Sequence, residues 1–387
     1  MDFELGEEHK MLIQTVRDFM VSEIEPLATK IDKEEKLPDG IWKKLGDMGL
    51  LGITVPEKYG GVGLDYLANL LVVKEMARVC ESLGMCYGVD TVTVIDNIYR
   101  NANEEQRQRF LPPMCRGEKI GALCITEPNH GSDAVGMECR ARPDGDFYVL
   151  NGEKMFITNA PIADIFLVYA KTAPERGAKG ITAFVVERGC QGSLEIQKLE
   201  KMGYRGSSTG QMWFDDYRVP RENVLGKENE GVRVLMSGLD TERTVLSGIP
   251  LGMSEIALEL SLKYSKERIQ FGQPIASFQM IQEKLSNMYT RTEAMRMLIY
   301  RAAAMAKISE RGGKGTELHK LAAAAYLFSG EESSKVVQDA VQIFGGYSYM
   351  MDFQVNRLFR ATKLNEIGGG SVEMRRLIIA EALLSGN

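Results

Sequence analysis

The chain has 387 residues, enough for two or three domains and a substantial core. Its net charge of −6 argues against nucleic-acid binding, and its 44% hydrophobic content is typical of a globular protein. No stretch reads as long and apolar enough to span a bilayer, and the acidic N-terminus is typical of neither a signal nor a transit peptide. We therefore expect a cytoplasmic protein without a membrane or nucleic-acid partner. The six cysteines form no C-x-x-C pair, so we expect buried thiols and no metal site.

Residues 1–121 are predicted to form an all-helical domain. Leu12, Val16 and Phe19 recur at helical spacing, and charged residues occupy the other faces of this first helix. Further helical stretches are expected at about 38–48, 66–80, 89–101 and 104–116.

Residues 122–232 are predicted to form a β domain. Asn151-Gly152 is a strong hairpin signal between two apolar runs. Short strand candidates follow one another closely, at 147–150, 154–157, 165–170, 181–187, 194–199 and 211–217. This pattern favours a small antiparallel barrel or sandwich.

Residues 233–387 are predicted to be helical again. Ile249, Met253, Ile256 and Leu260 form one apolar stripe. Long helices with wide apolar faces indicate a four-helix bundle, whose outer face could pair with a second subunit. The predicted fold class is therefore α+β, mostly α, in the order helical domain, β domain, helical bundle.

The stretch from Leu123 to Asp133 draws attention for its chemistry. An apolar run suited to a buried strand ends at Glu127-Pro128, because proline lacks an N–H. The small polar residues that follow can bring hydrogen-bond donors close to a flat ligand. On composition alone, a strand exit without any ligand is the simpler interpretation. The order of residues, however, resembles the signature segment of the acyl-CoA dehydrogenases, which are FAD enzymes that desaturate coenzyme A thioesters. Within that family, the isovaleryl-CoA dehydrogenase branch looks most similar.

This resemblance implies a flavin site in the β domain. Leu123, Ile125 and Thr126 match the strand whose threonine hydrogen-bonds the flavin ring, and Ser132 matches a residue that contacts the cofactor and the thioester end of the substrate. Thr158 matches a second flavin contact. Phe156 stands where the family usually has a tryptophan packed on the ring, and its alternative is an ordinary inward-facing strand residue.

The resemblance also implies an adenosine and pyrophosphate site contributed across a subunit interface. The matching residues are Arg268, Phe271, Gln279, Gln342, Gly345 and Gly346, with Ser371 as a further cofactor contact. An arginine fork suits a pyrophosphate, although Arg268 alone could equally be a solvated surface charge. The paired glycines Gly345 and Gly346 allow a ligand to approach the backbone closely. The glycines of this site do not form the G-x-G-x-x-G pattern of a Rossmann fold.

The position of the catalytic base is the most informative departure. In many family members a C-terminal glutamate removes the α-proton while a hydride passes to flavin N5. Here Gly369 replaces that glutamate, and Glu242 falls where the isovaleryl branch carries its base. A first-turn glutamate favoured by the helix dipole is the alternative for Glu242. Glu366 is a rival base, but the alignment of the glycines that follow it places Gly369, and not Glu366, at the position of the family's glutamate.

Four further positions are assigned to the substrate. Asp240 and Arg243 match residues that engage coenzyme A or hold the base helix, with a surface ion pair as the alternative. Gly369 is expected to free volume beside the acyl group, which would favour branched or cyclic chains. Asp90 is expected on a helix bordering the acyl pocket, where it could bind substrate or act as a second acid/base; a helix N-cap is its alternative.

The resulting hypothesis is an FAD-dependent acyl-CoA dehydrogenase that acts on a short branched or alicyclic acyl-CoA. By resemblance it would be a homotetramer that passes electrons to an electron-transfer flavoprotein. Two alternatives stay open: an enoyl-CoA reductase running the same chemistry in reverse, and a non-catalytic flavoprotein or assembly module of the same fold.

Overall fold

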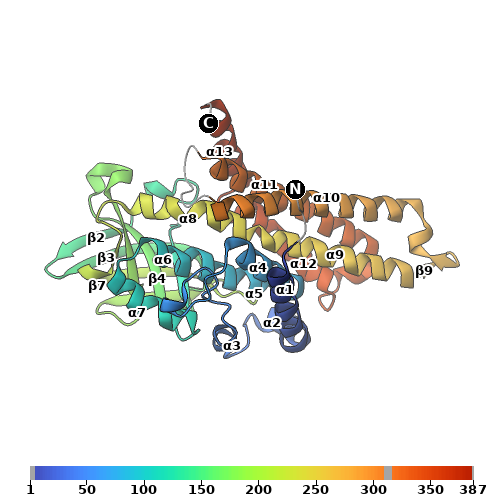
Figure 1. Ribbon diagram of the computed structural model, residues 1–387, viewed down its shortest axis with the longest axis horizontal. Coiled ribbons are helices and arrows are strands. Elements are labelled where there is room, and N and C mark those ends of the chain that lie inside the picture. Colours follow the sequence, from blue (N-terminus) through green and yellow to red (C-terminus); the bar gives the residue numbers. More distant parts are fainter. Residues whose placement is uncertain (1–4, 309–315, 386–387) are drawn as a thin grey trace.

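The computed structural model describes residues 5–308 and 316–385. Figure 1 shows the sheet at one end of an elongated molecule, with the long C-terminal helices reaching to the other end. The N-terminal helices pack along the middle of the molecule (Figure 1). Their bounds are α1 (Glu7–Phe19), α2 (Ala28–Glu34), α3 (Ile41–Asp47), α4 (Tyr66–Val79), α5 (Glu81–Gly88), α6 (Asp96–Asn101) and α7 (Glu104–Cys115).

Two of these helices begin where the sequence supplies a capping side chain. Asp65 accepts a hydrogen bond of 2.8 Å from the N–H of Ala68 at the start of α4. Asn103 and Gln106 form a reciprocal capping box at the start of α7. Each cap satisfies N–H groups that have no partner within the helix.

The middle of the chain forms one mixed sheet. Its strands follow the order β6-β7-β3-β2-β4-β5-β8, and β1 pairs with β4 outside that path. Their bounds are β1 (Gly121–Cys124), β2 (Arg140–Asp144), β3 (Phe147–Thr158), β4 (Ile165–Lys171), β5 (Ile181–Glu187), β6 (Ser193–Lys198), β7 (Thr209–Pro220) and β8 (Val224–Leu225).

The expectation of a wholly antiparallel sheet was wrong at β4. Both β1 and β2 run parallel to β4, the latter at a single pair of residues. The hairpin of β2 and β3 lies between β1 and β4 in the chain, and this long connection lets the two strands run in the same direction. Side chains on both faces of β4 are buried: Phe166 and Val168 pack into the core of the sheet, and Leu167 and Tyr169 into the core shared with the helices.

The C-terminal part contains more helices than the predicted four-helix bundle. In the described residues these are α8 (Gly231–Leu246), α9 (Gly248–Glu267), α10 (Gln279–Ile308), α11 (Glu317–Phe344), α12 (Gln354–Ile367) and α13 (Val372–Leu384), and the short hairpin of β9 (Ile269–Gln270) and β10 (Gln273–Pro274) follows α9. The N-terminal helix α4 also packs against α9. At Gly252 a side chain would lie 2.2 Å from the carbonyl oxygen of Lys74, so only glycine permits this close approach.

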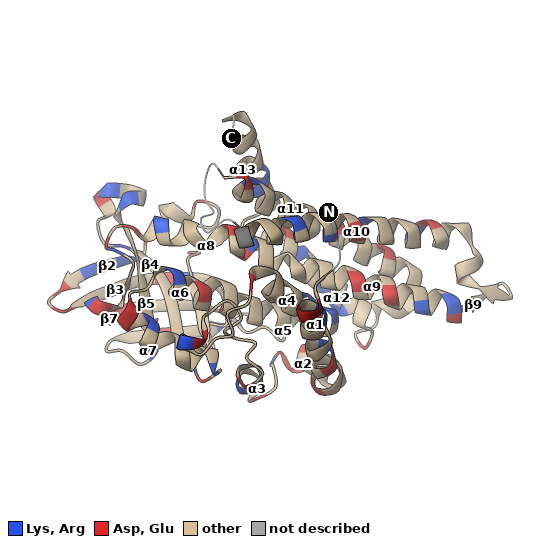
Figure 2. Ribbon diagram, in the orientation of Figure 1, with Lys and Arg blue, Asp and Glu red and all other residues tan. Residues whose placement is uncertain are grey.

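The interface between α4 and α9 contains charge as well as apolar surface. Charges of both signs are interspersed over the helical part of the molecule (Figure 2), and some of them are buried. Lys74 Nζ lies 2.9 Å from Glu75 and 3.3 Å from Glu255, which links α4 to α9. A buried pair of this kind specifies how the helices dock more than it stabilises them.

One segment corrects the expectation about membrane spans. Gly231–Glu267, which comprises α8 and α9, is long and apolar enough to cross a membrane by length and composition. In this protein 72% of its apolar window is buried among other elements. The apolar character of this segment is therefore explained by its place in the core of the fold.

Asp90 joins the helical part to the start of the sheet. It lies in a π-helix, Val89–Ile95, where it is completely buried, so it is not a helix N-cap. Its Oδ1 accepts a hydrogen bond of 2.8 Å from the N–H of Gly121, the first residue of β1. Asn159 donates to the carbonyl of the same glycine at 3.2 Å. Burial raises the pKa of Asp90 well above its usual range, which favours its protonated form.

A buried ion pair joins the exit of β1 to β3. Lys154 Nζ lies 2.8 Å from Glu127 Oε1, and both side chains are almost completely buried. Lys154 also donates to the carbonyl of Ile125 at 3.1 Å. Glu127 accepts further hydrogen bonds from the N–H groups of Glu138 and Cys139. The loop after β1 is therefore fixed from both sides by hydrogen-bonded charge.

Asp90→Asn should leave the protein at least as stable as the wild type at neutral pH, because Asn keeps an acceptor for the Gly121 N–H. The raised native pKa makes wild-type stability fall as pH rises from the unfolded value of about 3.9 towards the native one. The variant cannot ionise there, so its advantage should grow with pH. Urea unfolding at several pH values measures this. Asp90→Ala, which leaves the N–H unpaired, should lose about 1–3 kcal/mol; equal effects of both variants would contradict this account of Asp90.

Lys154→Met should lower the free energy of unfolding by about 3 kcal/mol, because Glu127 is left as a buried charge without its cation. Lys198→Met is the matched control on β6, where the lysine is exposed and lies 3.7 Å from Glu35; its loss should stay within about 1 kcal/mol. Urea unfolding of both variants provides the comparison. Similar losses would show that the buried pair has no special role.

Candidate active site

Glu242 lies far from the start of its helix. This helix, α8, begins at Gly231 and ends at Leu246, so Glu242 is not in its first turn. The helix dipole disfavours a carboxylate near a helix C-terminus, so the first-turn explanation of Glu242 fails. Its position requires another reason.

The surroundings of Glu242 favour proton transfer. The side chain is partly buried, and burial raises its pKa to about 7, while Arg243 and Arg100 oppose that rise. Burial also raises the pKa of Tyr169 on β4 and of Tyr326 on α11, and the charge of Glu242 adds to both shifts. A carboxyl group that titrates near neutral pH is suited to act as a general base.

Asp240 and Arg243 lie beside this carboxyl group and are buried. Asp240 Oδ1 lies 2.7 Å from Nδ1 of His319 on α11 and 3.5 Å from Nη1 of Arg243. The alternative of a surface ion pair is therefore wrong. These contacts tie α8 to α11, which fits the role of holding the helix of Glu242. Nε and Nη1 of Arg243 have no hydrogen-bond partner among the described residues, so its guanidinium could still bind a ligand.

The loop at Gly369 corrects one expectation. The space that a side chain at Gly369 would occupy is already filled by Tyr326, because a Cβ there would lie 2.7 Å from Cε1 of that ring. Gly368 adds no open room either, since its Cβ would lie 3.3 Å from the carbonyl oxygen of Leu364. Glu366 accepts hydrogen bonds from Ser334 and Lys363, and although burial opposes it, these contacts lower its pKa. A carboxylate held in this way is a poor base at neutral pH.

Thr126, Phe156 and Thr158 lie on two segments that are hydrogen-bonded to each other. The N–H of Met155 donates to the carbonyl of Thr126 at 2.8 Å. A β-bulge between Lys154 and Ile157 places Phe156 at a positive φ of 61° with 65% of its surface exposed. The alternative of an inward-facing strand residue is therefore wrong, and the packing of this ring on a flavin stays a prediction. Of the other predicted residues nearby, Leu123 and Ile125 are half-buried and Ser132 is exposed.

The predicted adenosine-binding residues form a separate cluster at the far end of the long helices (Figure 1). They are Arg268, Phe271, Gln279, Gln342, Gly345 and Gly346, and all are exposed. The rings of Tyr264 and Phe344 stack at 4.2 Å between the two segments, and the Arg268 guanidinium lies 5.8 Å from the Tyr347 ring centre. A Cβ at Gly345 or Gly346 would meet no atom within 4 Å, so a ligand could approach this backbone.

Two predicted residues have structural contacts in this protein. Ser371 is the N-cap of α13, where its hydroxyl oxygen accepts from the Met374 N–H at 3.5 Å. Asp90 is completely buried beneath β1, and the groups that shift its pKa differ from those around Glu242. A second acid/base role for Asp90 finds no support in this placement.

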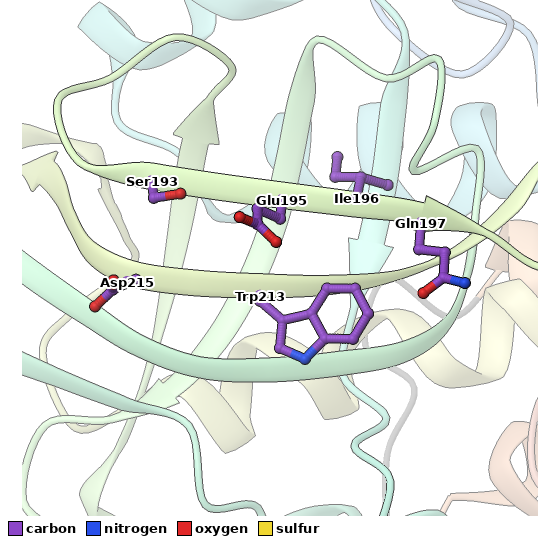
Figure 3. Close-up of a pocket in the computed structure, with 6 residues that line it drawn as sticks. All are labelled: Ser193, Glu195, Ile196, Gln197, Trp213 and Asp215. Carbon is purple, nitrogen blue, oxygen red and sulfur yellow. The ribbon is translucent and has the colours of Figure 1, made fainter.

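A hollow of about 440 Å³ lies elsewhere, on the outer strands of the sheet. Figure 3 shows Ser193, Glu195 and Gln197 along β6 opposite Trp213 and Asp215 of β7. None of the residues around Glu242 lines it. Two exposed carboxylates and the Ser193 hydroxyl, with no histidine or cation among the lining residues to activate it, offer no evident chemistry, so the candidate site is the one at Glu242.

Sequence reasoning missed four residues of this region. Glu127 and Lys154 were read only as parts of motifs, although a lysine inside an apolar strand is a signal that it needs a buried partner. Tyr326 and His319 lie on α11, and no local pattern separates them from their apolar neighbours.

The residues of the sheet fit a flavin. The backbone of Phe156 is held in the strained left-handed region, and its large ring is exposed to solvent. A flat cofactor would cover this ring. The hydroxyl groups of Thr126 and Thr158 on the adjoining segments could hydrogen-bond such a cofactor.

Comparison with known proteins identifies the family. The models for the acyl-CoA dehydrogenase N-terminal, middle and C-terminal domains match residues 6–118, 122–217 and 229–384. The mitochondrial isovaleryl-CoA dehydrogenase of Pongo abelii is 44% identical over 382 residues, which cover 98% of this chain and 89% of that protein.

Solved structures agree with this assignment. Butyryl-CoA dehydrogenase from Megasphaera elsdenii superposes with a TM-score of 0.95 at 35% identity and covers 99% of this chain and 100% of its own. An acyl-CoA dehydrogenase complexed with FAD from Bacillus anthracis gives a TM-score of 0.91 at 33% identity, covering 99% of this chain and 68% of its own. The chain therefore belongs to the acyl-CoA dehydrogenase family and is an FAD-dependent oxidoreductase.

Proposed function

We propose that this protein desaturates a short branched-chain acyl-CoA between the α and β carbons, with Glu242 as the base that takes the α-proton. The observation that carries the proposal is a carboxyl group whose pKa is raised to about 7 by burial. FAD, when bound, accepts the hydride that leaves the β carbon. The proton goes to Glu242, and the product is the 2-enoyl thioester.

The proposed substrate class is based on the similarity of this chain to a relative of known name. The relative named isovaleryl-CoA dehydrogenase is 44% identical across almost the whole chain, which supports a branched acyl group. An alicyclic acyl group stays a second possibility to be tested, although the filled space at Gly369 removes one argument for it.

The assembly follows from the separation of the two cofactor clusters. Thr126 and Phe156 lie on the sheet, whereas Arg268 and Gly346 lie at the opposite end of the molecule (Figure 1). A single FAD that contacts both clusters would then take them from two different chains. We therefore propose that a second copy completes each site, within a homotetramer of the family type, and that electrons leave through an electron-transfer flavoprotein.

The direction of the reaction depends on redox potentials and not on the identity of the base. By microscopic reversibility, the same Glu242 would deliver the α-proton if the protein worked as an enoyl-CoA reductase.

Glu242→Gln should lower the rate of flavin reduction by about 10³-fold, because Gln cannot accept the α-proton. Anaerobic titration of the FAD-loaded protein with acyl-CoA thioesters, followed by flavin absorbance, measures this. The panel contains butyryl, isovaleryl, 2-methylbutyryl, cyclohexanecarboxyl, cyclohexenecarboxyl and glutaryl thioesters. Isovaleryl-CoA or 2-methylbutyryl-CoA should bleach the wild-type flavin most strongly.

Glu366→Gln is the matched control, since Glu366 is engaged by Ser334 and Lys363. Its rate should stay within about threefold of the wild type. The reverse result, with Glu366→Gln inactive and Glu242→Gln active, would reassign the base. If no thioester bleaches the bound flavin, the reading as a non-catalytic flavoprotein takes precedence.

The pH dependence of kcat/KM should follow the ionisation of Glu242. Burial raises its pKa to about 7, and only the carboxylate accepts a proton. Activity should therefore rise through about pH 7 and fall about tenfold for each pH unit below it. Steady-state assays with isovaleryl-CoA between about pH 5 and pH 9 test this. Glu366→Gln should keep the same midpoint, and a profile that is flat across neutral pH would exclude Glu242 as the titrating base.

A further inference from the structure

Tyr326 takes the space that a side chain at position 369 would need. Gly369 has a positive φ of 64°, and a Cβ built there would lie 2.7 Å from Cε1 and 3.2 Å from the hydroxyl oxygen of Tyr326. Both atoms belong to the outer edge of the phenol ring. A carboxylate side chain at position 369 could therefore enter only if the ring moved.

The ring of Tyr326 is held firmly. It is almost completely buried, and the guanidinium of Arg375 lies 3.8 Å from its centre. Arg375 is itself fully buried and donates hydrogen bonds to the carbonyls of Tyr326, Asn365 and Gly368. One arginine thus fixes both the tyrosine and the loop that carries Gly369.

The same ring lies within electrostatic range of the proposed base. Burial raises the pKa of Tyr326; Arg375 and Arg243 oppose that rise, and the charge of Glu242 adds to it. The ring edge that touches Gly369 carries the hydroxyl group on which these charges act. The helix α11, which carries Tyr326, also packs against α8, the helix of Glu242.

We propose that Tyr326 is a specificity-determining residue: its ring fills the position left by the missing side chain at Gly369 and so limits the width of the acyl site beside Glu242. The inference rests on the proposed function, because it needs the acyl group to bind next to Glu242. It explains how a chain with glycine at this position can still have a narrow site. A branched acyl group of isovaleryl size fits such a site better than a six-membered ring.

Tyr326→Leu tests the proposal, because leucine keeps an apolar side chain but removes the outer part of the ring. The measured quantity is the ratio of kcat/KM for cyclohexanecarboxyl-CoA to that for isovaleryl-CoA, assayed with the FAD-loaded protein and an artificial electron acceptor. We expect the ratio to rise at least about tenfold, the effect of matching a pocket to a larger apolar group. Tyr326→Phe keeps the ring, so its ratio should stay within about twofold of the wild type.

An unchanged ratio in a Tyr326→Leu protein that binds FAD and melts cooperatively would overturn the proposal. Where the leucine variant does not fold, Tyr326→Met replaces it, because methionine adapts to irregular space; its ratio must move in the same direction. An unchanged ratio in the folded methionine variant likewise overturns the proposal. Absence of turnover by the wild type with every thioester is a different result, since it rejects the proposed function itself.

Discussion

The buried ion pair of Glu127 and Lys154 is the interaction on which the sheet end of the site depends. It joins the loop after β1 to β3 through two side chains that are almost completely buried. The pair is satisfied by backbone N–H groups on the Glu127 side and by a backbone carbonyl on the Lys154 side. Because β3 bulges immediately afterwards, the same pair fixes where Phe156 emerges and which segment Thr126 faces. A salt bridge here supplies geometry, and the apolar core supplies the stability.

The pKa values of Asp90 and Glu242 are both shifted by burial, and the two groups serve different ends. Asp90 has one strong partner, the N–H of Gly121, and no cation among the groups that shift its pKa. Glu242 has Arg243 and Arg100 close by, and these bring its pKa back to about 7. Burial favours the neutral form of the first group, whose hydrogen bond to Gly121 anchors a strand. The second remains able to exchange a proton near neutral pH, which is the property that catalysis needs.

Much of the fold could be predicted from the sequence, because helical periodicity and turn signals are local. The helices at Tyr66 and Glu104 begin where their caps indicate. The segments that carry Thr126 and Phe156 are hydrogen-bonded neighbours, and their role towards a flavin stays a prediction. The failures concern long-range relations. Parallel pairing at β4 and the filled space at Gly369 depend on elements distant in the sequence.

The glycine contact between α4 and α9 has a consequence for the way the chain is made. α4 lies in the first third of the sequence and α9 begins only after the main sheet, and their buried side chains belong to one continuous core. The face of α4 that packs on α9 cannot be covered until α9 has left the ribosome, after the whole sheet has been synthesised. The sheet is thus inserted between two sets of helices, and these can pack together only after both have been synthesised.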